Sequence, residues 1–162
     1  MNFYFSIQMV LLAIIILIVQ VFIPVIRFYN LEIVPDILII FLVYVGYFYG
    51  RFEAIILGFI FGIIQDFVTQ VELLGVMAFD KSLIGYGLGS MALYKSIWSR
   101  NFRMFFIFVI YSLHFFIYYY IKFNGEPISN ALIIQIIFIH SILCFFILWV
   151  FDQSIIKNGV SR

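Results

Sequence analysis

Long apolar stretches separated by short polar segments make up nearly the whole chain. Such runs, at roughly 17–25 residues, are long enough to cross the hydrocarbon layer of a bilayer. The pattern predicts six membrane-spanning helices, at about residues 5–26, 35–49, 52–68, 73–93, 102–121 and 130–150. The segments between them are too short to form a soluble domain. We therefore expect one all-α polytopic membrane domain over residues 1–162, folded as a bundle of six transmembrane helices.

Composition supports a membrane location and limits the classes of partner. Hydrophobic residues make up 66% of the 162 residues, charged residues 10%, and the mean hydropathy is +1.20. A soluble domain cannot bury so large an apolar fraction. The formal net charge of +1 is nearly balanced, so nothing favours a nucleic-acid partner.

The basic residues predict the orientation in the membrane. With the N-terminus in the cytoplasm, the inner segments hold six Lys and Arg residues and the outer segments hold two. The inner ones are Arg51, Lys95, Arg100, Arg103, Lys157 and Arg162, and the outer ones are Arg27 and Lys122. Because cytoplasmic segments carry an excess of Lys and Arg, both termini are expected inside.

Two predicted helices each carry a smooth face that ends in an ionisable residue. The residues recur every four positions: Gly58, Gly62 and Asp66 in one helix, and Lys81, Gly85 and Gly89 in the next. Residues at this spacing share one side of a helix, and glycines there let two backbones approach closely in lipid. These faces are candidates for packing, either inside the bundle or against a separate protein's helix.

Four ionisable groups fall in the outer half of the membrane under this topology: Asp36, Asp66, Asp80 and Lys81. A charge at the bilayer centre costs at least ~2.5–3.5 kcal/mol, so these groups should face the bundle interior and pair. We expect Lys81 to pair with Asp66, with Asp36 as the other candidate. Simpler interpretations remain: Asp36 follows Pro35 at a helix start, where an acid is favoured, and Asp66 and Lys81 can extend towards the headgroups.

No pattern in the sequence favours catalysis, a cofactor or a metal. His114 and His140 lie among apolar residues without an acidic neighbour at helical spacing, so each is expected to be a helix-bonding histidine and not part of a catalytic or metal site. Neither a nucleophile elbow nor a phosphate-binding glycine loop is present. Cys144 is the single cysteine, which excludes an intrachain disulfide. The tyrosines at 118–120 are typical of an outer aromatic belt.

A series of short motifs in the middle of the chain resembles a known family. In order they are Pro35-Asp36-Ile-Leu, Gly50-Arg51, Gly58-x-x-x-Gly62-x-x-Gln65-Asp66, Leu74-Gly75, Lys81 and Gly85-Tyr86-x-x-Gly89. Together they resemble the rod shape-determining protein MreD family from Pro35 to Gly89. The first and last two predicted spans match it only as apolar helices.

The resemblance implies a non-enzymatic scaffold subunit of the bacterial cell-elongation (rod) complex. Such a subunit lies in the cytoplasmic membrane and docks partner helices to support cell shape and lateral peptidoglycan synthesis. The implied partners are the single-span protein MreC, the synthases RodA and penicillin-binding protein 2, and the filament protein MreB. The family also resembles, in fold, the six-helix substrate-binding subunits of energy-coupling-factor transporters.

Two other functions remain open from the sequence. One is a vitamin-type transporter subunit, in which the outer polar residues would line a ligand pocket. Such subunits share an A-x-x-x-A pair in the first span, whereas Ala13 here stands among larger residues. The other is a flippase or proton-relay subunit that uses Asp36, Asp66, Asp80 and Lys81.

The predicted orientation can be tested by labelling. Gln70→Cys and Ser99→Cys, each in a Cys144→Ser background, should react from opposite sides with an impermeant thiol reagent, because the first position is expected outside and the second inside. Labelling of Ser99→Cys from outside intact cells would overturn the orientation.

Overall fold

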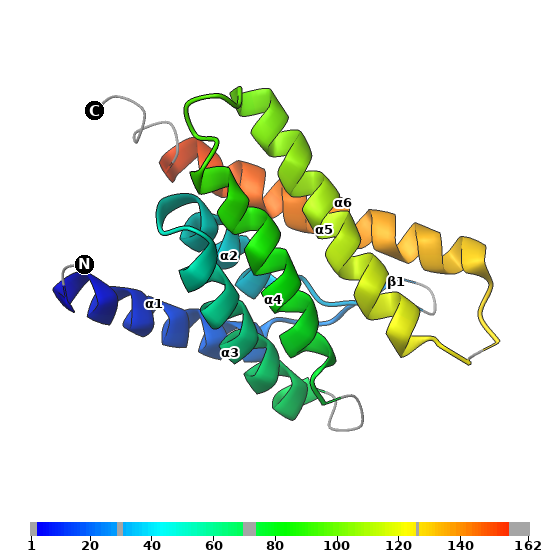
Figure 1. Ribbon diagram of the computed structural model, residues 1–162. Coiled ribbons are helices and arrows are strands. Elements are labelled where there is room, and N and C mark those ends of the chain that lie inside the picture. Colours follow the sequence, from blue (N-terminus) through cyan, green and yellow to red (C-terminus); the bar gives the residue numbers. More distant parts are fainter. Residues whose placement is uncertain (1–2, 29–30, 70–73, 126, 156–162) are drawn as a thin grey trace.

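Six α-helices and one short β-hairpin form the described part of the protein (Figure 1). The computed structural model describes residues 3–28, 31–69, 74–125 and 127–155. Its elements are α1 (Phe3–Phe22), β1 (Ile26–Phe28), β2 (Leu31–Ile33), α2 (Ile37–Phe48), α3 (Arg51–Thr69), α4 (Val76–Gly89), the 3₁₀ turn η2 (Ser90–Ala92), α5 (Arg100–Lys122) and α6 (Asn130–Ile155). The outer loop predicted at Gln70–Glu72, and Lys157 and Arg162, lie outside these ranges.

The helices fall where the apolar runs predicted them, but the segment after α1 differs. α1 ends at Phe22 instead of residue 26, and the chain then forms an antiparallel hairpin in which Ile26 pairs with Ile33. Pro24 explains the early end, because proline lacks the N–H that a continuing helix needs. The connection between α2 and α3 is a tight turn, with Gly50 at φ +104°.

α2 lies at the centre of the bundle. Eight of its 12 residues are buried, and it packs against α1, α3, α4 and α6. At about 1.5 Å per residue the helix is roughly 18 Å long, well short of a ~30 Å hydrocarbon core. α2 is therefore a core element, surrounded by the longer helices.

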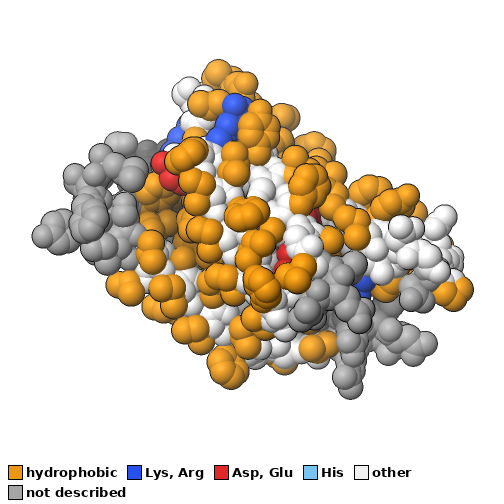
Figure 2. Space-filling view, turned by 60° about the horizontal axis from the view of Figure 1, so that its bottom comes forward, with side chains coloured by type: hydrophobic (Ala, Val, Ile, Leu, Met, Phe, Trp, Pro, Cys, Tyr) orange, Lys and Arg blue, Asp and Glu red, His pale blue; other side chains and the backbone are white. Residues whose placement is uncertain are grey.

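The outer surface of the bundle is strongly apolar, as expected for a membrane protein. Figure 2 shows hydrophobic side chains over most of the visible face, with Lys and Arg atoms gathered chiefly at one end. Among the described residues, α5 and α6 are each long and apolar enough to cross a membrane, while parts of α1 and α2 are apolar but shorter. α3 and α4 carry buried charges and do not meet that criterion.

α3 and α4 form the closest helix pair, and the predicted smooth faces lie between them. A Cβ atom added at Gly62 would overlap the backbone of Met77 and Ala78, and one added at Gly85 would overlap the backbone of Ala54. Gly58 and Gly89 are equally confined, against the backbones of Lys81 and Arg51. The smooth faces are thus used inside the bundle.

Basic side chains cluster at the end of the bundle where α4 leads into α5. Arg100 pairs with Asp152 of α6 at 3.2 Å, and Arg103 donates to the carbonyl of Trp98 at 3.1 Å. Lys95 lies 4.3 Å from the centre of the Tyr47 ring. Partial burial, together with nearby Arg103, lowers the pKa of Lys95.

We expect Gly62→Leu to destabilise the protein far more than Ile60→Leu. A leucine at 62 would push α3 away from α4, and such overpacking typically costs ~1–3 kcal/mol. Ile60 is 43% exposed on the same helix, so its change is a matched control. Thermal unfolding in detergent measures the difference. Equal midpoints for the two variants would contradict the close packing of α3 on α4.

Candidate functional site

A buried cluster of four ionisable side chains joins α2, α4 and α5. The ammonium of Lys81 forms an ion pair with Asp36, and the ring of His114 lies between two carboxylates. Its Nδ1 is 2.7 Å from Asp80 Oδ2, and its Nε2 is 3.5 Å from Asp36 Oδ2. All four side chains are at most 5% exposed. The cluster thus brings two carboxyl groups, one ammonium and one imidazole together inside the bundle.

Asp36 also begins α2. Its Oδ1 accepts hydrogen bonds from the amides of Leu38 and Ile39, at 3.0 and 3.3 Å, as an N-cap does. The helix-start interpretation and the ion-pair interpretation of this residue are therefore both correct. One carboxylate caps the central helix with one oxygen and holds Lys81 with the other.

The expected pairing of Lys81 with Asp66 is wrong. Asp66, at the end of α3, accepts hydrogen bonds from the amides of Gly75, Met77 and Ala78 at 2.9–3.2 Å. The cap position of α4 is Gly75, which has no side chain to satisfy these amides. A carboxylate from the preceding helix fills that role, and the helix dipole favours its charge there. Asp66 is buried, so it does not extend towards the headgroups.

Both histidines make their polar contacts with other segments of the bundle, not with their own helices. His140 on α6 lies 2.7 Å from the carbonyl of Val34 through Nε2, and 2.9 Å from the Tyr119 hydroxyl through Nδ1. A carbonyl only accepts, so Nε2 carries the proton and Tyr119 donates to Nδ1. Phe115 stacks on the His140 ring, with 3.9 Å between the two ring centres. Tyr119 is 3% exposed, so it is not part of an aromatic belt.

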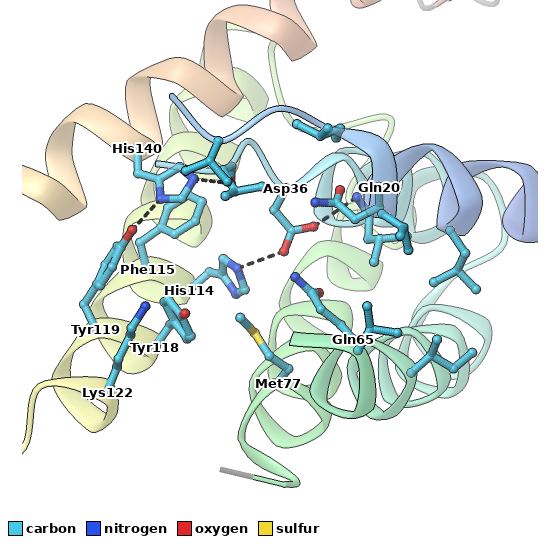
Figure 3. A pocket seen from close by; sticks show the side chains of 18 residues that line it. Gln20, Asp36, Gln65, Met77, His114, Phe115, Tyr118, Tyr119, Lys122 and His140 are labelled. Carbon is cyan, nitrogen blue, oxygen red and sulfur yellow. Dashed lines mark hydrogen bonds and ion pairs between the residues drawn. The ribbon is translucent and has the colours of Figure 1, made fainter. Parts of the chain in front are cut away.

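A cavity of about 400 Å³ lies beside the cluster, at the end of the bundle opposite Lys95, Arg100 and Arg103. Figure 3 shows Asp36 and His114 in contact with each other in its wall, with Tyr118, Tyr119 and Lys122 along one side. Gln20 closes the opposite side: its amide accepts from the backbone N–H of Ile37 at 2.7 Å and donates to the carbonyl of Pro35 at 3.1 Å. No motif or spacing in the sequence singles out Gln20.

The ionisable side chains of the cluster beside the cavity are held by neighbouring groups. Within the described residues, no three His, Cys, Asp or Glu side chains are grouped so that they could hold a metal ion. Cys144 is buried in the core, with no nucleophilic role suggested by its surroundings. The acids of the cluster are held by bases or backbone amides, which fits a structural or binding role.

A second hollow, the α1/α2/α6 groove, is almost wholly apolar and holds about 770 Å³. Residues of α1 and α2 make up most of its lining, and α6 contributes Phe151. Its lining residues are Met9, Leu12, Ile16, Val19, Ile37, Ile40, Phe41, Tyr44, Phe48, Tyr49 and Phe151. α1 packs weakly here, and among its described side chains only Ala13 is buried.

Comparison with known proteins identifies the family. The family model described as rod shape-determining protein MreD matches residues 1–157. The chain belongs to the MreD family. No curated protein and no solved structure gives a significant match, so a likeness to energy-coupling-factor subunits has no support from these comparisons. Membership in the MreD family assigns the chain a membrane role in rod-shape determination, in association with the rod-shape complex.

The structure brings together only part of the predicted set. Asp36 and Lys81 meet, Asp66 lies apart as a helix cap, and the glycines pack α3 on α4. His114 is the important residue that sequence reasoning misjudged. Its acidic neighbours come from α2 and α4, so spacing along α5 carries no sign of them.

We expect strong energetic coupling between Lys81 and Asp36 in a double-mutant cycle. Lys81→Met or Asp36→Asn alone strands a buried charge, which typically costs ~3–5 kcal/mol, whereas the double variant leaves no unmatched member of the pair. Unfolding of the purified protein in detergent measures the coupling.

The control for this cycle is the pair of Lys81→Met and Asp66→Asn. Asp66 binds backbone amides of α4 and not the ammonium, so its coupling to Lys81 should be clearly smaller. Additive losses for Lys81 and Asp36, or larger coupling to Asp66, would refute the observed pairing.

Proposed function

We propose that this MreD-family chain is a non-enzymatic, multi-pass scaffold of the bacterial inner membrane with both termini in the cytoplasm. In this proposal it docks the single transmembrane helix of MreC and thereby joins the rod complex that contains RodA, penicillin-binding protein 2 and MreB. The observation that carries the proposal is the α1/α2/α6 groove, an apolar hollow on the membrane-facing surface of the bundle. The chain's membership in the MreD family supplies the link to rod shape.

The form of the groove supports a helix as its occupant. In lipid, helices associate by close packing and hydrogen bonding, because lipid tails are as apolar as the side chains. A concave groove offers a partner helix more contact than a flat face does.

The remaining features of the bundle support a scaffold in other ways. The smooth faces of α3 and α4 are already filled by each other, so they offer no surface to a partner. The charge cluster fixes α2 against α4 and α5, and α2 contributes much of the lining of the groove. The partner site is therefore expected on α1, α2 and α6.

We expect Leu12→Trp to reduce recovery of MreC with the protein from native membranes, at least tenfold. The indole would occupy the groove, where Leu12 is 44% exposed, and a blocked central contact typically costs more than 1.4 kcal/mol. Leu113→Trp is the matched control, since Leu113 is 40% exposed on α5, away from the groove. Co-purification followed by mass spectrometry measures recovery.

A photoreactive residue at position 12 gives a second measurement that does not depend on blocking. It should form an adduct with the MreC helix, whereas the same residue at position 113 should not. Normal MreC recovery with Leu12→Trp, or adducts with lipid only at position 12, would contradict docking in the groove.

A further inference from the structure

The cavity beside the charge cluster is separate from the α1/α2/α6 groove and has a different character. Its lining combines polar side chains from α1, α3, α5 and α6 and from Asp36, the cap of α2, with apolar residues near its edge. A volume of about 400 Å³ falls within the range of roughly 300–1,000 Å³ that is usual for small-molecule sites. It can hold a compact polar group, but it is too small for a transmembrane helix.

The carboxylates near the cavity are already engaged, so the cavity is not built for a cation. Asp36 accepts two backbone amides through Oδ1, and its Oδ2 faces both Lys81 and His114. A cationic ligand would have to displace Lys81 from a fully buried pair. Gln20 is engaged as well, since its amide group bonds the backbone at both of its ends.

Lys122 supplies the charge that is left for a ligand. It lines the cavity at the end of α5, and its ammonium lies 5.4 Å from the centre of the Tyr118 ring. Within the described residues, no carboxylate lies within ion-pair distance of it. Figure 3 shows Lys122 beside Tyr118 and Tyr119 on one wall of the cavity. An ammonium beside aromatic rings, with no carboxylate near it in the described part of the chain, favours an anionic group.

The edge of the cavity indicates what is attached to that anion. Val21 on α1 and Ile64 and Val68 on α3 line it and are 57%, 38% and 55% exposed. These apolar side chains lead from the cavity to the membrane-facing surface. An acyl chain can lie along them while the polar end of the same molecule enters the cavity. We propose that this cavity holds the anionic headgroup of a membrane lipid, which Lys122 recognises.

The proposal can be tested on the full chain in nanodiscs that contain phosphatidylcholine and phosphatidylglycerol. Native mass spectrometry should show one retained phosphatidylglycerol on the unmodified protein. Lys122→Gln should bind it about fivefold more weakly, the usual effect of one basic residue near a membrane surface. Lys95→Gln is the matched control, because Lys95 also lies over a tyrosine ring but at the opposite end of the bundle. The Lys95→Gln variant should retain phosphatidylglycerol as well as the unmodified protein does.

Two further arms identify the source of the anion. Val21→Trp, at the exposed edge, should reduce retention with little effect on the stability of the lipid-free protein. Inorganic phosphate should raise the unfolding temperature less than phosphatidylglycerol does. Three outcomes would overturn the proposal: unchanged retention with Lys122→Gln, equal retention of both lipids, or stabilisation by phosphate equal to that by phosphatidylglycerol. These readouts do not involve MreC, so they stand or fall separately from the docking proposal.

Discussion

The arrangement of the bundle depends on the need to pair a lysine that has no access to water. Lys81 is fully buried, and a buried ammonium is tolerated only beside an opposite charge. Asp36 provides that charge, and the same carboxylate starts the central helix α2. The pair therefore fixes the position of α4 relative to the first turn of α2. His114 extends the same constraint to α5 through Asp80.

The residues that hold the helices together are largely different from those that line the surfaces available to other molecules. The features with the strongest pattern in the sequence, the glycines and the ionisable residues, are used to hold α2, α3, α4 and α5 together. The apolar α1/α2/α6 groove and the polar cavity near Lys122 result from the way in which the helices pack. In this account, the groove and the cavity are the surfaces that bind other molecules, although neither has a recognisable motif in the sequence.

The sequence was sufficient for the helices but not for the contacts between them. Apolar length predicted each helix to within a few residues, and the four-residue glycine spacing predicted close packing that the structure places between α3 and α4. The partner of Lys81 was misassigned, because Asp66 and Asp36 are equally plausible by helical position. The choice depends on Gly75, which leaves the amides of α4 without a local cap and so draws Asp66 to them. His114 was misjudged because its partners come from other helices.

The most direct test is an experimental structure of the chain with MreC in a lipid bilayer. The account predicts one MreC helix in the α1/α2/α6 groove, while Lys81 stays paired with Asp36 and the smooth faces of α3 and α4 stay in contact with each other. A partner helix packed against Gly58, Gly62, Gly85 or Gly89, or a groove filled with lipid alone while MreC binds elsewhere, would contradict it.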